Sequence, residues 1–362
     1  MGEYDTAFDS LRHINEFMTL QGYYDLQVEY YLDLVKVYDE IGDKSNWKYT
    51  ASLTSLGNAY HSLGQYQQAI QYHQQSLAID IETGDRNGEA TSYIGLGSAY
   101  LSLGQYQQAI QYHQQSLAIF TEIGDLAEGE IRKAARNGEA TSYIGLGSAY
   151  LSLGQYQQAI QYYQQSLAIF TEIGDLAEGE IRKAARKGEA NSYGNLGSAY
   201  YSLGQYQQAI QYYQSALQLF QQLGNPHNVI ICLDNLGETY RVLKQYPQAI
   251  ECYQAILEIK RNLQDKEGEA RTLIILGGIY QQSGKIKEGF ALSYQGNQIL
   301  QELGLPLSEM PYPQWLKSCI QFAQQGKLQL ILCFVVGVVA FPFALVGFIV
   351  LLLWRWVRSK VR

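Results

Sequence analysis

The chain has 362 residues and a net charge of −8, and its basic residues are concentrated toward one end. Residues 305–362 hold six Lys or Arg and one Glu, which leaves residues 1–304 with a net charge of −13. Because nucleic-acid binding depends on Lys and Arg that neutralise phosphates, this acidic body argues against a nucleic-acid partner.

Residues 1–49 contain one imperfect copy of a pattern that fills most of the chain. The letters GYYDLQVEYYLDLVKVYDEIGD at residues 22–43 align with GQYQQAIQYHQQSLAIDIETGD at residues 64–85. Terminal units of repeat proteins have a neighbour on one side only and are usually atypical. We therefore expect a degenerate helical repeat at the N-terminus.

Residues 50–303 contain six copies of the pattern, and a Leu-Gly dipeptide marks each one. A tyrosine follows three positions after this glycine, and a second glycine follows seven positions after it in every copy except the fifth, which has Lys244. The glycines of the dipeptide are Gly57, Gly97, Gly147, Gly197, Gly237 and Gly277.

Apolar and small residues around the dipeptide have the 3.6-residue period of a helix, and the second glycine favours a helix end. Another amphipathic segment follows, so each copy predicts a helical hairpin. One hairpin cannot bury its apolar faces alone. Successive hairpins must therefore stack into a solenoid.

These copies resemble tetratricopeptide repeats. In the second copy the positions characteristic of that family are occupied by Tyr93, Leu96, Gly97, Tyr100, Gly104, Ala109, His113 and Ser116. The link GDRNGEA and the 40-residue period resemble the variant seen in kinesin light chains and in many prokaryotic arrays. The resemblance implies an all-α, right-handed α-solenoid of about seven hairpins.

Two consecutive 50-residue blocks, 86–135 and 136–185, are identical except that Tyr163 replaces His113. Each block ends in ten additional residues, LAEGEIRKAA, at 126–135 and 176–185. The apolar residues of this insertion keep a helical spacing. We therefore expect lengthened helices that protrude at the repeat junctions.

The chain shows none of the common catalytic or metal-binding motifs. HExxH, GxSxG, paired CxxC and phosphate-loop patterns are all missing from the sequence. His73 and His113 occupy the repeat position where later copies have tyrosine, which indicates packing and not metal binding. The sequence predicts a protein that is not an enzyme and needs no cofactor or metal.

The family resemblance implies protein or peptide binding in a concave groove lined by the first helix of each hairpin. Only Asn58 matches the Lys, Asn and Arg residues with which chaperone-binding members clamp a terminal carboxylate. The positions that correspond to ligand contacts are Thr54, Asn58, His61, Ile94, Ser98, Leu101, Ile144, Ser148, Leu151, Ser198, Tyr201, Asp234, Glu238, Arg241, Ile274 and Gln281. In the middle of the groove this lining is aliphatic and hydroxyl-bearing, which suits a peptide segment. For each aliphatic residue, packing within the array is an equal alternative to contact with a partner.

The C-terminal part of the sequence predicts attachment to a membrane. Residues 304–327 contain three prolines and then an amphipathic stretch, which favour a short linker and an interfacial helix. Residues 328–354 carry no charged side chain, and as a helix of about 40 Å they are long enough for a hydrocarbon core of about 30 Å. The tail at 355–362 is basic.

Two topologies remain open for this segment. The basic tail favours a cytosolic C-terminus, and an array with no export signal at its N-terminus is also expected in the cytosol. One straight span cannot satisfy both expectations. The alternatives are a single kinked span and a hairpin that turns at Pro342.

The sequence as a whole predicts a membrane-anchored scaffold whose cytoplasmic array recruits proteins through its groove. An assembly factor for one membrane protein complex is the alternative. Self-association through the near-identical blocks is left open by the sequence.

Overall fold

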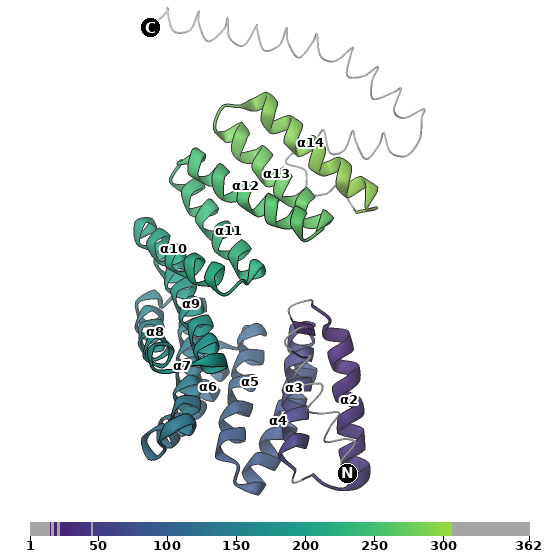
Figure 1. The fold of residues 1–362 in the computed structure, drawn as a ribbon, viewed down its shortest axis with the longest axis vertical. Coiled ribbons are helices and arrows are strands. Elements are labelled where there is room, and N and C mark those ends of the chain that lie inside the picture. Colours follow the sequence, from purple (N-terminus) through teal and green to yellow (C-terminus); the bar gives the residue numbers. More distant parts are fainter. Residues whose placement is uncertain (1–14, 16–17, 20–21, 45, 306–362) are drawn as a thin grey trace, which may run out of the picture. The chain divides into compact units, whose positions relative to one another are not determined.

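The computed structural model describes residues 15, 18–19, 22–44 and 46–305, and the regular structure within them is helical (Figure 1). The helices are α2 (Tyr24–Ile41), α3 (Trp47–Ser62), α4 (Tyr66–Thr83), α5 (Arg86–Ser102), α6 (Tyr106–Leu126), α7 (Gly129–Ser152), α8 (Tyr156–Leu176), α9 (Gly179–Ser202), α10 (Tyr206–Gln222), α11 (Pro226–Val242), α12 (Tyr246–Asn262), α13 (Lys266–Gln282) and α14 (Ile286–Glu302). The chain divides into two compact units, Met1–Cys252 and Tyr253–Arg362, and the boundary falls within α12.

The predicted membrane segment at 328–354 and the basic tail at 355–362 lie outside the described residues, as do residues 306–327. Among the helices that are described, none combines the length and the apolarity needed to cross a bilayer.

In the first unit the hairpins α3–α4, α5–α6, α7–α8 and α9–α10 stack in chain order, and each helix packs against the next. The helices α3, α5, α7, α9 and α11 also contact one another in succession, and we call them the first-helix layer. Within the described part of this unit, successive second helices make no comparable contact. The first-helix layer therefore lies on the inner side of the stack, because helices approach more closely on the inside of a curve.

The helix ends follow from glycines and from capping side chains. Gly104, for example, has a φ of +75°, and the following residue, Gln105, donates its backbone N–H to the Tyr100 carbonyl at 2.9 Å. This is the left-handed helix stop that favours glycine. At the start of the same helix, Asp85 accepts a hydrogen bond from the backbone N–H of Gly88 at 2.9 Å, which caps α5.

In the hairpins α3–α4, α5–α6, α7–α8 and α9–α10, a ring of the second helix packs against the glycine of the Leu-Gly dipeptide. A Cβ atom added to Gly97 would lie 2.6 Å from the His113 ring, and one added to Gly147 would lie 2.5 Å from the Tyr163 ring. Such distances are too short for real Cβ atoms. Glycine is therefore required at this position, because the ring from the second helix fills the space a side chain would need.

The ten-residue insertions lengthen the helices on both sides of a short connection. α6 continues to Leu126 and α7 begins at Gly129, so that α6 has 21 residues and α7 has 24. The corresponding helices without an insertion, α4 and α5, have 18 and 17 residues. Ala127 and Glu128 leave the helical conformation, so the chain reverses direction within the insertion.

In the second unit, α13 and α14 pack closely because small residues face each other. A Cβ atom on Gly289 would lie 2.5 Å from the Gly277 carbonyl oxygen, and one on Gly296 would lie 2.5 Å from the Ala270 carbonyl oxygen. Gly289 and Ser293 occupy positions that hold alanine and an aromatic ring in other repeats. Their small size allows backbone contact where the other hairpins place a ring.

We expect Lys244→Gly to stabilise the chain. Lys244 has a φ of +58° at the helix stop where most copies have glycine, and this conformation costs a side-chain-bearing residue about 1 kcal/mol. Urea denaturation followed by circular dichroism should show a higher midpoint for this variant. The reciprocal change Gly204→Ala, at a φ of +74° with open space around it, should lower the midpoint. Equal midpoints for all three chains would contradict this account.

Candidate partner-binding surface

The first-helix layer carries most of the residues expected to contact a partner. They lie on α3 (Thr54, Asn58 and His61), α5 (Ile94, Ser98 and Leu101), α7 (Ile144, Ser148 and Leu151), α9 (Ser198 and Tyr201) and α11 (Asp234, Glu238 and Arg241). Asn58 and Asp234 are exposed, and the others are half-buried. Ile274 and Gln281 lie on α13, in the second unit.

The aliphatic members of this set also contribute to packing. Ile94 packs against the cluster that contains Phe120, and Ile144 packs against two neighbouring clusters. Ile274 is only 8% exposed and packs with Ala270 and Leu300. We therefore remove Ile274 from the candidate surface, because burial leaves too little of its side chain for a partner.

The hydroxyl-bearing members are largely occupied by bonds within the array. Ser148 donates to the Ile144 carbonyl at 2.9 Å, and its oxygen lies 3.1 Å from the Tyr163 hydroxyl. The Tyr213 hydroxyl donates to Ser198 at 3.2 Å in the next hairpin. These serines orient the buried tyrosines, so their capacity to bind a partner is reduced.

His61 and the charged residues on α11 are held in place as well. His61 Nε2 lies 2.9 Å from the Ser102 hydroxyl, and burial lowers the pKa of His61 although the Ser98 backbone opposes the shift. Arg241 donates two hydrogen bonds to Glu238, at 2.7 and 2.6 Å. This bidentate pair presents a fixed polar surface at one end of the layer.

A cavity of about 170 Å³ between α9 and α11 was not expected from the sequence. Four asparagines distinguish its wall. Its lining residues are Ala190, Asn191, Gly194, Asn195, Ser198, Phe220, Asn228, Ile231, Cys232 and Asn235. Burial raises the pKa of the Cys232 thiol to about 11, so this thiol stays protonated at neutral pH.

The asparagine side chains of this cavity have no hydrogen-bond partner within the part of the chain that is described. They are at least partly accessible, so water can solvate them. Each amide can donate and accept hydrogen bonds. The cavity therefore offers both kinds of group to a ligand, and no Lys or Arg lines it.

A local change in the repeat sequence produces the cavity. TSYIGLG at residues 141–147 becomes NSYGNLG at residues 191–197, so that Gly194 stands where Ile144 stands one repeat earlier. A Cβ atom on Gly194 would meet nothing within 4 Å. Comparison of the two nearly identical copies is the signal by which the sequence could have revealed this site.

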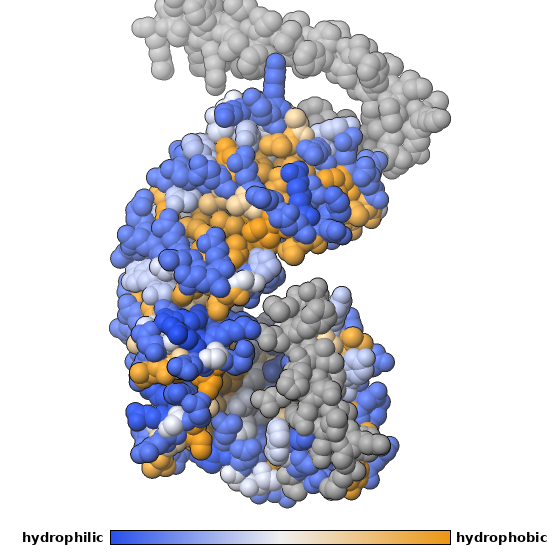
Figure 2. Space-filling model, viewed as in Figure 1, coloured by the Kyte–Doolittle hydropathy of each residue, from blue (hydrophilic) through white to orange (hydrophobic). Residues whose placement is uncertain are grey.

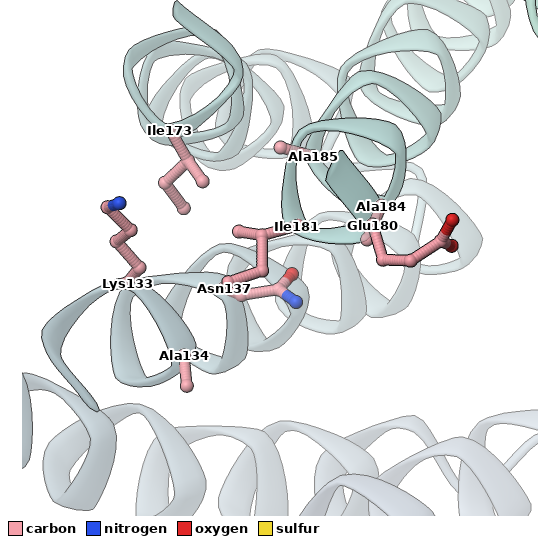
Figure 3. Close-up of a pocket in the computed structure, with 8 residues that line it drawn as sticks. All are labelled: Lys133, Ala134, Asn137, Ile173, Glu180, Ile181, Ala184 and Ala185. Carbon is pink, nitrogen blue, oxygen red and sulfur yellow. The ribbon is translucent and has the colours of Figure 1, made fainter. Parts of the chain in front are cut away.

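A second cavity of about 220 Å³ lies between the two insertions. Lys133 of α7, Ile173 of α8 and Ile181 of α9 surround it, whereas the Glu180 carboxylate points away from it (Figure 3). Its wall is mainly apolar, and Leu126 and Leu176 at the ends of the lengthened helices are 81% and 69% exposed. Apolar contact is the interaction that this second surface can offer.

The buried histidines have a packing role in this structure. His73 and His113 are each 1% exposed, and neither ring nitrogen has a hydrogen-bond partner within the described residues. Burial lowers the pKa of each to about 4, with a further small effect of His61 on His73. Within the described residues, no group of three or more His, Cys, Asp or Glu is arranged to hold a metal ion.

The sequence model of one family, described as tetratricopeptide repeat, matches residues 49–122, 130–172, 188–262 and 230–292. A comparison with curated proteins found no sequence match.

Solved structures share the fold at low sequence identity. The protein BtubC from P. vanneervenii is 19% identical, with a TM-score of 0.53 over 69% of this chain and 93% of that one. A signal-transduction ATPase with a tetratricopeptide repeat sensor, from Pyrococcus horikoshii, is 20% identical, with a TM-score of 0.57 over 76% of this chain and 40% of that one. A Rap protein complexed with competence and sporulation factor is 12% identical, with a TM-score of 0.52 over 84% of this chain and 99% of that one.

The buried histidines predict that acid destabilises the array. At pH values well above 6.5, the ordinary pKa of an imidazole, both rings are neutral in the folded and unfolded states and have no effect on the pH dependence. As the pH falls toward 4, the unfolded chain binds protons that the buried rings cannot accept, so stability is lost. Each histidine should cost about 2 kcal/mol between pH 7 and pH 5.

His113→Tyr should remove one histidine's share of this loss, because it makes residues 86–135 identical to residues 136–185. His113 is the better test position. The hairpin of His73 also contains buried Asp80, whose pKa is raised by burial and which therefore opposes the histidine effect. Urea midpoints of both chains at pH 7 and pH 5 provide the measurement. An equal loss in the two chains would show that His113 does not contribute.

Proposed function

The chain belongs to the tetratricopeptide repeat family, and on that premise we propose that it binds a protein segment along its first-helix layer and performs no catalysis. The single observation that carries this proposal is the asparagine-lined cavity between α9 and α11.

The chemistry of the cavity suits the backbone of an extended segment. A peptide backbone presents one N–H donor and one C=O acceptor per residue, and the amides of Asn191, Asn195 and Asn235 can pair with both. A terminal carboxylate would instead need a cation, and none lines the cavity. We therefore infer recognition of an internal segment and not of a chain end.

The size of the cavity points to one side chain of a longer ligand. Pockets for small molecules usually measure about 300–1,000 Å³, and this one measures about 170 Å³. Ile231, which is 46% exposed, supplies an apolar wall next to the amides. A segment that places one apolar or small polar side chain in the cavity, with its backbone on the asparagines, fits these features. The Rap structure, solved with competence and sporulation factor bound, supports a binding role for this fold.

We further propose that residues 328–354 attach the array to a membrane, with the array in the cytoplasm. The support is the sequence of this segment, which has no charged side chain and is followed by a basic tail. Attachment would hold the bound partner at the bilayer surface. A kinked span and a hairpin at Pro342 remain the two topologies under this proposal.

Filling the cavity should strongly reduce partner capture. Gly194→Ile restores the residue found at positions 94 and 144, so the helix should tolerate it while the cavity closes. A photo-reactive amino acid at position 191, which is exposed, should capture the partner in cells, and Gly194→Ile should reduce the yield about tenfold if the site supplies a central contact. Mass spectrometry identifies the captured protein, and binding of its segment can then be measured with purified components.

The matched control is Gln165→Ala, on the exposed side of α8, which should leave capture unchanged. Unchanged capture by the Gly194→Ile chain would refute binding at this cavity. Capture of the subunits of one membrane complex alone would favour the assembly-factor alternative over a general scaffold.

Membrane attachment predicts that the full chain sediments with membranes and that a chain ending at Lys327 does not. A protease site and tag fused after Arg362 then distinguish the topologies in sealed vesicles. A single span requires cleavage from the side opposite to the array, whereas a hairpin requires cleavage from the same side. A full chain that stays in the soluble fraction would exclude attachment.

A further inference from the structure

The two ten-residue insertions form a pair of protruding arms. The first arm comprises residues 123–137, at the end of α6 and the start of α7, and the second arm comprises residues 173–187, at the end of α8 and the start of α9. Their sequences are identical except at the last position, which is Asn137 in the first arm and Lys187 in the second. Differences in exposure between corresponding residues therefore reflect what surrounds each arm.

An apolar face of the second arm is covered by the first arm. It consists of Ile173, Ala177 and Ile181, which correspond to Ile123, Ala127 and Ile131 in the first arm. The first two positions are 4% and 2% exposed in the second arm but half-buried in the first, and the third is 37% exposed against 65%. Lys133 of the first arm shares a cavity with this face, and α7 contacts α9 (Figure 3). The same apolar face on the first arm has no arm before it, because α4 and α5 carry no insertion.

The other side of each arm shows the reverse difference. Lys133 and Asn137 of the first arm are half-buried, whereas Lys183 and Lys187 of the second arm are exposed. The second arm covers this side of the first, but α10 and α11 have 17 residues each and carry no insertion that would cover the second arm. The pair of arms therefore ends in an uncovered apolar face and in an uncovered lysine face.

These two faces are the separate halves of a contact that the chain already makes once. Within the chain, the apolar face of one arm packs against the lysine side of an arm of the same sequence. Hydrophobic and hydrophilic surface accordingly lie close together over α6, α7 and α8 in Figure 2. A second copy of the chain offers both missing halves, so that two copies related by a twofold axis can cover each other's free faces.

The first arm leaves room for an arm of another copy. Arg86, where α5 begins, corresponds to Arg136, and α7 begins seven residues earlier, at Gly129. At a rise of about 1.5 Å per residue, α7 therefore extends about 10 Å beyond the start of α5. This step is about as deep as one helix is wide, so a helix from another copy can lie beside the first arm.

The charges along an arm favour antiparallel pairing. Asp125 and Glu128 near the tip of the first arm are exposed, and so are Lys183 and Lys187, which lie closer to the body of the array on the second arm. Parallel arms from two copies would place acidic tips side by side. Antiparallel arms instead place the acidic tip of one copy beside the lysines of the other, and the two arrays then approach from opposite sides.

We propose that two copies of the chain associate through their arms, with the apolar face of each first arm packed antiparallel against the lysine face of the other copy's second arm. Each copy then contributes both halves of two equivalent contacts. The resulting dimer carries two candidate partner-binding surfaces. The proposal does not depend on which partner those surfaces bind.

Charge reversal tests this pairing in the full chain. One variant makes the tip of the first arm basic (Asp125→Lys with Glu128→Lys), and a second variant makes the second arm acidic (Lys183→Glu with Lys187→Glu). Two copies of either variant place like charges together, so recovery of one tagged chain with a differently tagged chain from detergent extracts should fall at least about tenfold. One copy of each variant places opposite charges together at both contacts, which should restore the wild-type recovery.

All four substituted side chains are exposed, so the fold should be retained, and circular dichroism checks this. Loss in both single-variant pairs with restoration in the mixed pair supports the proposal. Absence of recovery for the wild-type pair would overturn it. Equal recovery of every pair, or a loss that the mixed pair does not restore, would also overturn it.

Cross-linking locates the contact independently. Ile131→Cys in one tagged full chain and Ala184→Cys in a chain with a different tag, both with Cys319→Ser and Cys333→Ser, should be joined in cells by a short, permeable bis-maleimide. A product that carries both tags must link two chains. The control is Gln164→Cys in place of Ile131→Cys. It is exposed on α8 about two turns before the second arm and should give at least about fivefold less product. Equal yields at the two positions would exclude the proposed contact.

Discussion

Close contact between a glycine on one helix and a ring on the next is the constraint on which the array in the first unit depends. The His73 ring occupies the space that side chains would need at both Gly57 and Gly95, and His113 does the same at Gly97 and Gly145. One ring therefore fixes the spacing within its hairpin and to the following hairpin. The stability of such an array is close to the sum of the stabilities of its hairpins and of the interfaces between neighbouring hairpins. Each ring therefore contributes to the stability of its own hairpin and to that of one interface.

The candidate site arises where this regular packing changes. In the third of the nearly identical copies, Asn195 occupies the position of Gly95 and Gly145, and Gly194 replaces an isoleucine. The ring of the hairpin α9–α10 belongs to Tyr213, whose hydroxyl donates to Ser198, whereas the histidine nitrogens have no partner within the described residues. The hairpins thus keep their spacing, while asparagine side chains replace apolar surface at one contact between hairpins. Binding capacity can be introduced in this way without loss of the stack.

The ion pairs near the insertions show that the partner of an arginine depends on which residue each copy of the repeat supplies. Arg86 pairs with Glu122, and Arg136 with Glu172, in each case between the first and the second helix of one hairpin. Gln222 stands where the next such glutamate would be, and Arg186 pairs with Asp175 instead. These exposed pairs contribute little energy individually, so their role is to set local geometry near the insertions.

Periodicity in the sequence determined the hairpins, the glycine stops such as Gly104, the lengthened helices at the insertions and the assignment of the first-helix positions through the family resemblance. These features depend on residues close together in the chain, where spacing alone predicts which side chains share a helix face.

Only the tertiary structure showed that Ile274 is buried, that Ser148 and Ser198 form hydrogen bonds with the buried tyrosines, and that Asn195 and Asn235 line one cavity. The last two residues are 40 positions apart, and their proximity depends on how α9 packs against α11. Repeat spacing gives the order of the helices. The space that remains between two packed helices depends on the volumes of the side chains at each contact. At this contact, one missing isoleucine side chain opens the cavity.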